Sequence, residues 1–235
     1  MLAIFKRELR SYFTGAIGYV FLVIYLAMAG VLFAYTTLFS MSGDVTTFFT
    51  LMLLFSAIVL PLLTMKSFSE ERKTKTEQLL LTSPVSLTGM MLGKFFASYT
   101  MFAGATLLSS LYFLLLIPYT QLKFAVLIGN VVALLLVGFV FIAIGLFVSS
   151  LTENQLSAAI GTIAIILGFL AIGLIGALIP SNYWIRSVFD ALSIFRRFQT
   201  FTAGYFDLAS LFYYLSVGTV FLWLTVRTYD RRRCD

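Results

Sequence analysis

The chain has 235 residues, of which 60% are hydrophobic and 11% charged, and this composition excludes a soluble domain and predicts a protein that crosses a membrane several times. A formal net charge of +6 would suggest nucleic-acid binding in a soluble protein, but in a membrane protein the distribution of charge matters more, so we expect no nucleic-acid partner. The lack of histidine and the single cysteine, Cys234, exclude an intramolecular disulfide, a Cys/His metal cluster and histidine-based catalysis within the chain.

Residues 1–14 have the pattern of an amphipathic helix. Apolar residues recur at spacings of three and four, and basic residues lie opposite them. This pattern predicts an interfacial helix on the cytoplasmic side of the membrane, with its cations near anionic headgroups. The alternative is a basic flank that only orients the first span. A signal peptide is disfavoured, because the apolar run that follows is longer than the roughly 7–15 residues of a signal-peptide core.

Six apolar runs of about 20 residues follow, each long enough to cross a hydrocarbon core of roughly 30 Å as a helix. Ion-coupled transporters usually bury ionisable residues along their pathway, and these runs contain no Asp, Glu, Lys or Arg. Any transport must therefore draw its energy from elsewhere. The chain is predicted to be a single all-α polytopic transmembrane domain, 1–235, whose spans cover about 17–39, 45–65, 95–117, 124–148, 158–179 and 208–226.

The basic residues predict the orientation of the spans. Twelve of the 16 Lys and Arg residues lie near the two termini or in segment 66–94. The other side of the membrane would carry only Lys123, Arg186, Arg196 and Arg197. Such an excess predicts a multi-pass protein of the plasma (inner) membrane with both termini and segment 66–94 in the cytoplasm.

Segment 66–94 is the long polar interruption between the second and third spans. Its charges crowd into Glu70–Glu77, which leads directly into the apolar Leu79–Leu81. This order predicts a short amphipathic helix that ends before Pro84, because proline lacks a backbone donor and disfavours helix before it. Such a helix could rest apolar side chains on the membrane domain and present charges to a soluble partner.

The sequence Gly89–Lys94 does not match a phosphate-binding loop. Only three residues separate its two glycines where four are required, and Phe95 follows the lysine in place of Ser or Thr. We therefore expect Lys94 to be a snorkelling residue at the base of the third span.

The segment 181–207, before the last span, carries one apolar and one polar stripe at helical spacing. The pattern predicts one or two short amphipathic helices on the outer face. They could form an outer gate or simply a connector that floats on the headgroups. The residues of such a gate would be Ile185, Phe189, Leu192 and Phe195.

The polar segment also invites comparison with a known family. The runs Ser69–Arg72, Thr76–Ser86 and Gly93–Lys94 closely resemble the first cytoplasmic loop of ABC-2 type transporter permeases. The opening Phe5–Phe13 is similar to their N-terminal interfacial helix. Among these permeases, the chain is most similar to those associated with gliding motility and with related multidrug or copper-processing systems. It departs from them at Lys75, where the family usually has glycine.

The resemblance implies the transmembrane half of an ABC exporter with the type V exporter-like fold. Two permease subunits, forming a homo- or heterodimer, would pair with two separate ABC ATPase subunits that bind ATP and Mg²⁺. This chain would then be no enzyme and hold no cofactor. Residues from about Ser69 to Leu81 would form the coupling helix. Its implied contact residues are Glu70, Glu71, Arg72, Thr76 and Glu77 toward the ATPase, Leu79 and Leu80 toward the spans, and Pro84 at its end.

A non-transporting membrane scaffold or enzyme is the alternative. The candidate catalytic group is Asp190 with Arg186, Arg196 and Arg197, and it lacks a nucleophile, a base or a set of metal ligands. A passive channel is disfavoured as well, because no ring-forming charge or carbonyl filter is visible.

Overall fold

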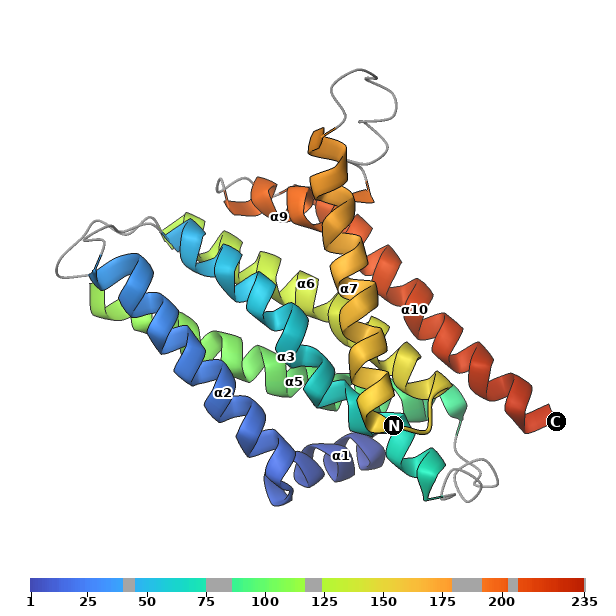
Figure 1. Cartoon of the computed structure of the whole chain (residues 1–235). Helices are drawn as coiled ribbons and strands as arrows, with labels where there is room; N and C mark the ends of the chain where they lie inside the picture. Colours follow the sequence, from blue (N-terminus) through green and yellow to red (C-terminus); the bar gives the residue numbers. More distant parts are fainter. Residues whose placement is uncertain (40–44, 75–85, 117–123, 179–191, 203–206, 235) are drawn as a thin grey trace.

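The computed structural model describes residues 1–39, 45–74, 86–116, 124–178, 192–202 and 207–234 (Figure 1). In this part of the chain all regular structure is helical. Six helices are long and apolar enough to cross a membrane. They are α2 (Ala16–Phe33) with its π-helical extension Ala34–Leu38, α3 (Val45–Lys73), α5 (Leu87–Ser110) with its 3₁₀ extension Leu111–Leu116, α6 (Phe124–Leu151), α7 (Gln155–Leu178) and α10 (Leu208–Cys234). They confirm the predicted all-α polytopic fold.

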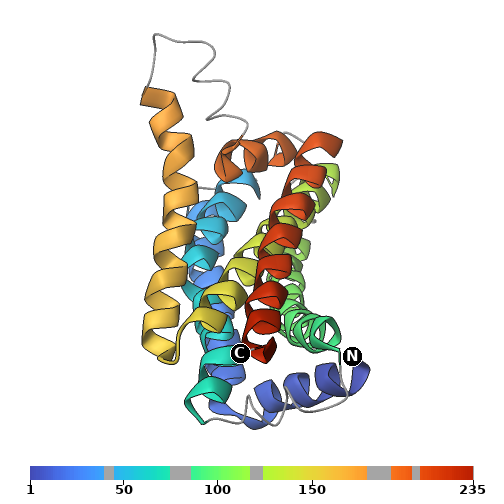
Figure 2. The same cartoon turned by 90° about the vertical axis from the view of Figure 1, so that its right-hand side faces the viewer.

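Two shorter helices cross the ends of this bundle. Helix α1 (Leu2–Thr14) lies across the end where both chain termini are found, and α9 (Ile194–Thr202) lies across the opposite end (Figure 2). The chain breaks direction between α1 and α2 at Gly15, which has an extended backbone conformation. The bundle therefore has two ends that are each closed by a helix running crosswise.

Helices α3 and α5 extend beyond the apolar runs of the sequence. The second span was expected to end near Met65, but α3 continues to Lys73, and α5 begins at Leu87, where the hydroxyl of Ser86 accepts the N–H of Gly89 at 3.3 Å. Charged residues are good helix formers, so a loss of hydropathy marks where the bilayer ends and not where the helix ends. The predicted polar loop is accordingly shorter than 66–94.

Helices α3 and α6 form the centre of the bundle. Small residues on α6 let its neighbours approach closely, as is usual where lipid gives no hydrophobic drive for helix association. A Cβ atom on Gly145 would lie 2.1 Å from the hydroxyl oxygen of Thr64 on α3, and one on Gly138 would lie 1.9 Å from the ring of Phe102 on α5. These two glycines fix how closely the central helices meet.

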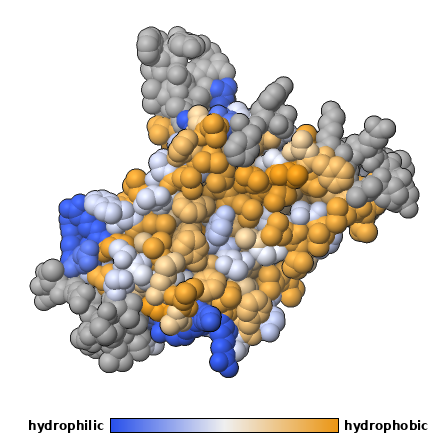
Figure 3. All heavy atoms as spheres, turned by 180° about the vertical axis from the view of Figure 1, so that it is seen from behind, coloured by the Kyte–Doolittle hydropathy of each residue, from blue (hydrophilic) through white to orange (hydrophobic). Residues whose placement is uncertain are grey.

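On the face shown in Figure 3, the surface between the two ends is largely hydrophobic, and hydrophilic residues gather near the end that carries α1 and the last turns of α10. This distribution suits a chain whose middle is surrounded by lipid.

Candidate functional site

Most of the charged residues of the described chain gather where α1, the end of α3, the start of α5 and the α6–α7 turn meet. We call this region, together with the last turns of α10, the basic end. Lys94, Glu71 and Glu8 lie within it, and the polar segment between α3 and α5 leaves from it. Any soluble partner that binds that segment would therefore act on the basic end.

Lys94 is the centre of this region. Its side chain is only 1% exposed, although it carries a charge. The Nζ atom lies 2.7 Å from the Glu71 carboxylate, donates to the Ser67 carbonyl at 2.6 Å, lies 3.5 Å from the Glu8 carboxylate, and stands 4.9 Å above the Phe68 ring. The snorkelling expected from the sequence is wrong, because the ammonium group turns inward to acceptors on α3 and α1. The burial of a lysine requires such pairing.

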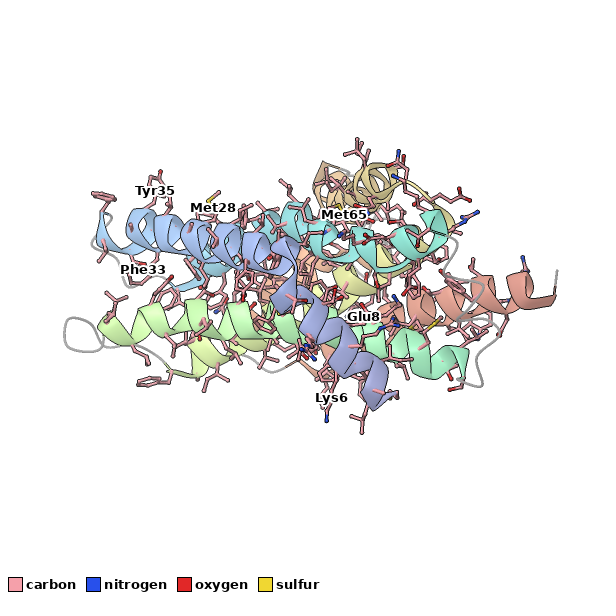
Figure 4. All side chains as sticks on the ribbon, turned by 90° about the horizontal axis from the view of Figure 1, so that it is seen from below. Lys6, Glu8, Met28, Phe33, Tyr35 and Met65 are labelled. Carbon is pink, nitrogen blue, oxygen red and sulfur yellow. The ribbon has the colours of Figure 1, made fainter. Side chains whose placement is uncertain are left out.

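Helix α1 contributes one acidic and one basic side chain to the group of charges around Lys94. Glu8 lies toward the other helices, whereas Lys6 points away from them (Figure 4). Arg7 donates to Glu8 at 2.7 Å and to Glu71 at 3.4 Å. The hydrogen bond with Glu8 is the main reason why the pKa of the Arg7 guanidinium is raised. Arg7, Glu8, Glu71 and Lys94 therefore form a neutral cluster of two cations and two anions, which we call the charge cluster.

A second polar contact holds α1 one turn further along. The Tyr12 hydroxyl donates to the Leu63 carbonyl at 3.1 Å and lies 2.9 Å from the hydroxyl of Ser98. Burial raises the pKa of Tyr12 to about 12, so the phenol keeps its proton and remains a donor at physiological pH. Helix α1 is thus bound to both α3 and α5.

The end of α3 is also tied to the turn between α6 and α7. Arg72 donates to the Leu151 carbonyl at 2.7 Å and pairs with Glu153 at 3.0 Å. One turn deeper, the Ser149 hydroxyl donates to the Met65 carbonyl at 3.1 Å. The last two turns of α3 therefore connect α1 and α5 on one side with α6 and α7 on the other.

These contacts change the roles of the predicted coupling residues. Glu71 and Arg72 were expected to face an ATPase, but both side chains are engaged within the chain, since their partners come from α1, α5 and the α6–α7 turn. Glu70 is 45% exposed and pairs with Lys66 at 3.2 Å. The start of the predicted coupling helix belongs to α3. The remaining coupling residues, Thr76, Glu77, Leu79, Leu80 and Pro84, lie outside the described residues.

A polar pocket of about 590 Å³ opens beside the charge cluster. Its walls come from α1, from the α1–α2 junction at Gly15 and from the last turns of α3, and Lys94 lines its inner side. The pocket lies at the level where α1 crosses the bundle. Because acidic and basic groups line it side by side, it favours neither an anion nor a cation.

At the opposite end, α9 packs on α6 with a different face from the predicted one. Its buried face is formed by Ile194, Phe198 and Phe201, whereas Leu192 is 47% exposed and Phe195 is partly buried. Of the apolar stripe read from the sequence, only Phe195 lies within α9, and it stands beside the buried face of that helix and not at its centre. The other two gate residues, Ile185 and Phe189, lie outside the described residues.

Two tyrosines of α10 hold α9 in place. The Tyr214 hydroxyl donates to the Ile194 carbonyl at 2.8 Å, and the Tyr213 hydroxyl donates to the Leu192 carbonyl at 2.5 Å. Arg197 stacks on the Tyr213 ring at 4.4 Å. Sequence reasoning identified neither tyrosine, since a hydroxyl within an apolar run carries no signal of its partner.

Asn130 lies in α6 near the end covered by α9, and its side chain is fully buried. Its amide group donates to the Val126 carbonyl at 2.8 Å, but its Oδ1 atom has no hydrogen-bond partner among the residues that the structure describes. A buried acceptor without a partner costs about 1–3 kcal/mol. Movement that opened this end to water would relieve that cost.

Comparison with known proteins gives one match. A family model described as ABC-2 family transporter protein matches residues 33–227, which include the segment between α3 and α5 as well as α9 but not α1. No curated protein matches the chain.

Proposed function

The chain belongs to the ABC-2 transporter family, and from this premise we propose that it is the permease subunit of an exporter driven by a separate ATPase. Proteins of this family form the membrane component of an ABC transporter and generally work with an ABC ATPase. ATP and Mg²⁺ would be bound by that partner, and this subunit would convert the partner's movement into movement of cargo.

The observation that carries this proposal is the convergence at the basic end. The segment that resembles the permease coupling loop joins α3 to α5, and the end of α3 contacts α1, α5, α6 and the α6–α7 turn through named side chains. Movement of this segment would therefore be transmitted to most of the helices of the bundle. We propose that the basic end lies in the cytoplasm of a plasma-membrane protein, as the excess of basic residues favours.

The proposed docking surface consists of the exposed end of α3 and the segment that follows. Lys73 and Thr74 are exposed and precede Thr76 and Glu77, which belong to the part of the chain that resembles the coupling loop. Leu79 and Leu80 would hold the segment against the membrane domain, with Pro84 at its end. Glu71 and Arg72 would act indirectly, through the helices that they join.

At the other end, α9 with Leu192 and Phe195 would form part of an outer gate, together with Ile185 and Phe189. The hydrogen bonds from the α10 tyrosines support this, because they hold α9 over that end of the bundle. The buried Oδ1 atom of Asn130, which has no partner among the described residues, supports it as well, because opening this end to water would lower its free-energy cost. A second permease subunit, identical or related, would complete the pathway, and membrane lipids would surround both.

Co-purification of the chain from its native membrane tests the proposal. We expect an ATPase to co-purify, and we expect Glu77→Arg and Lys73→Glu to abolish its binding. Arg196→Glu makes the same charge change as Lys73→Glu on α9 and should leave binding intact. We avoid Glu71→Arg, because it would also break the charge cluster. A chain that purifies alone and keeps its function would contradict the proposal and favour a scaffold.

A further inference from the structure

Helix α1 contacts α5 at three points, and the contacting residues of α1 follow one face of that helix. Near its start, Ile4 packs against Gly93, where an added Cβ would lie 3.1 Å from the Ile4 methyl group. One turn on, Glu8 pairs with Lys94, and one further turn on, Tyr12 contacts Ser98. A helix that merely floated in the headgroups would have no reason for such a match. Helix α1 is docked on the bundle.

Two of these contacts join α1, α3 and α5: Tyr12 also donates to the Leu63 carbonyl of α3, and the contact at Lys94 is the charged one. Lys94 belongs to α5, its closest carboxylate is Glu71 on α3, and Glu8 belongs to α1. Two of the acceptors around Nζ, the Glu71 carboxylate and the Ser67 carbonyl, accept hydrogen bonds, and the Glu8 carboxylate adds a longer ion pair at 3.5 Å. The lysine is thus held by groups of α3 and α1.

The charge of Lys94 also offsets a repulsion. Glu8 and Glu71 both lie within 3.5 Å of Nζ, so their carboxylates approach each other across it. Without the ammonium group, two largely buried anions on α1 and α3 would face each other, with Arg7 as the cation that contacts both of them. Loss of the Lys94 charge would therefore weaken the attraction between α1 and α3 and leave the two carboxylates to repel each other.

We propose that Lys94 is a positioning residue that locks α1 onto α3 and α5, so that these three helices move as one body. The movement of these three helices under the action of an ATPase rests on the proposed function. The docking itself does not, and it can be tested on this chain alone.

The test measures how readily a thiol on the inner face of α1 is labelled. Leu9 is partly buried against the core next to Glu8. In a Cys234→Ser background, Leu9→Cys provides a single thiol, and its rate of reaction with a membrane-impermeant maleimide is measured in lipid nanodiscs. We expect Lys94→Met to raise that rate at least about tenfold, which corresponds to about 1.4 kcal/mol in the docking equilibrium.

Two further variants make the test decisive. Glu8→Gln removes only the negative charge of α1 and leaves the Lys94–Glu71 pair intact. This variant should therefore fold and still increase the labelling rate of the Leu9→Cys thiol. Lys66→Met removes an exposed cation from the same end and should leave the rate unchanged. If Glu8→Gln and Lys94→Met were both labelled at the wild-type rate, the docking role would be refuted.

The concerted movement is tested separately in the complex with its ATPase. Spin labels on α1 and α5 should report the same distance distribution with and without bound nucleotide, and Lys94→Met should broaden it. A wild-type distance that changes with nucleotide would overturn the single-body inference. Absence of a co-purifying ATPase would instead refute the proposed function and leave the labelling result valid.

Discussion

Removal of the Lys94 ammonium group should destabilise the chain more than any other single charge change at the basic end. The side chain of Lys94 is 1% exposed and that of its partner Glu71 is 19% exposed. Breaking a buried ion pair costs about 3–5 kcal/mol, because the remaining charge stays buried. Since Glu71 keeps some exposure and retains Arg7 at 3.4 Å, we expect the lower end, about 3 kcal/mol, for Lys94→Met. This corresponds to roughly a 150-fold change in the ratio of folded to unfolded chain.

Equilibrium unfolding in mixed detergent micelles with added SDS measures this loss. Lys66→Met is the matched control, because Lys66 and Glu70 are 41% and 45% exposed and their pairing contributes about 0.5 kcal/mol or less. Combining Lys94→Met with Glu8→Leu and Glu71→Leu should recover most of the loss, since apolar replacement of buried ion partners is often neutral and the remaining Arg7 side chain is 54% exposed to water. Equal losses in Lys94→Met and Lys66→Met, or no recovery in the triple variant, would refute the reasoning.

Three further outcomes follow from the rest of the structure. Gly145→Leu should cost about 2 kcal/mol or more in the same unfolding assay, because its Cβ would lie 2.1 Å from a threonine hydroxyl on α3; Gly168→Leu, whose Cβ would meet nothing within 4 Å, should stay within about 0.5 kcal/mol. Asn130→Leu should raise the free energy of unfolding by about 1 kcal/mol, because it removes a buried acceptor that has no partner among the described residues, and an unchanged or lower value would contradict that assignment. At the start of α10, the side-chain hydrogen bond from Ser210 lowers the pKa of Asp207, and two backbone N–H groups lower it further. The ionised Asp207 carboxylate therefore stabilises the fold fully above a pH of about 4, and this contribution is lost as the pH falls through the folded-state pKa. Thermal unfolding of Asp207→Ala should therefore differ from that of the wild type at pH 7 and converge with it in strong acid.

The positions of the six spans could be predicted because the length of an apolar run is a local property of the sequence. The ends of α3 and α5 could not, since residues such as Glu70 and Lys73 leave the bilayer without leaving the helix. The face of α9 was missed for a related reason, because the register of a short helix depends on where it begins.

The charge cluster depends on contacts between residues far apart in the sequence. Glu71 and Lys94 are 23 residues apart, and the hydrogen bond that brings Tyr12 to Ser98 spans 86. One local signal was present: Glu8 is the one acidic residue in 1–14 and lies four residues from both Ile4 and Tyr12, which places a negative charge on the inward face of an otherwise basic helix. An acid in that position calls for a buried cation, and Lys94 supplies it.

Site-directed photocrosslinking tests most directly whether the basic end receives the ATPase. A photoreactive residue in place of Lys73, at the exposed end of α3, should capture a chain that binds ATP, whereas one in place of Leu192, near α9, should not. Capture from position 192, or a co-purifying ATPase that is not captured from the basic end, would contradict the account.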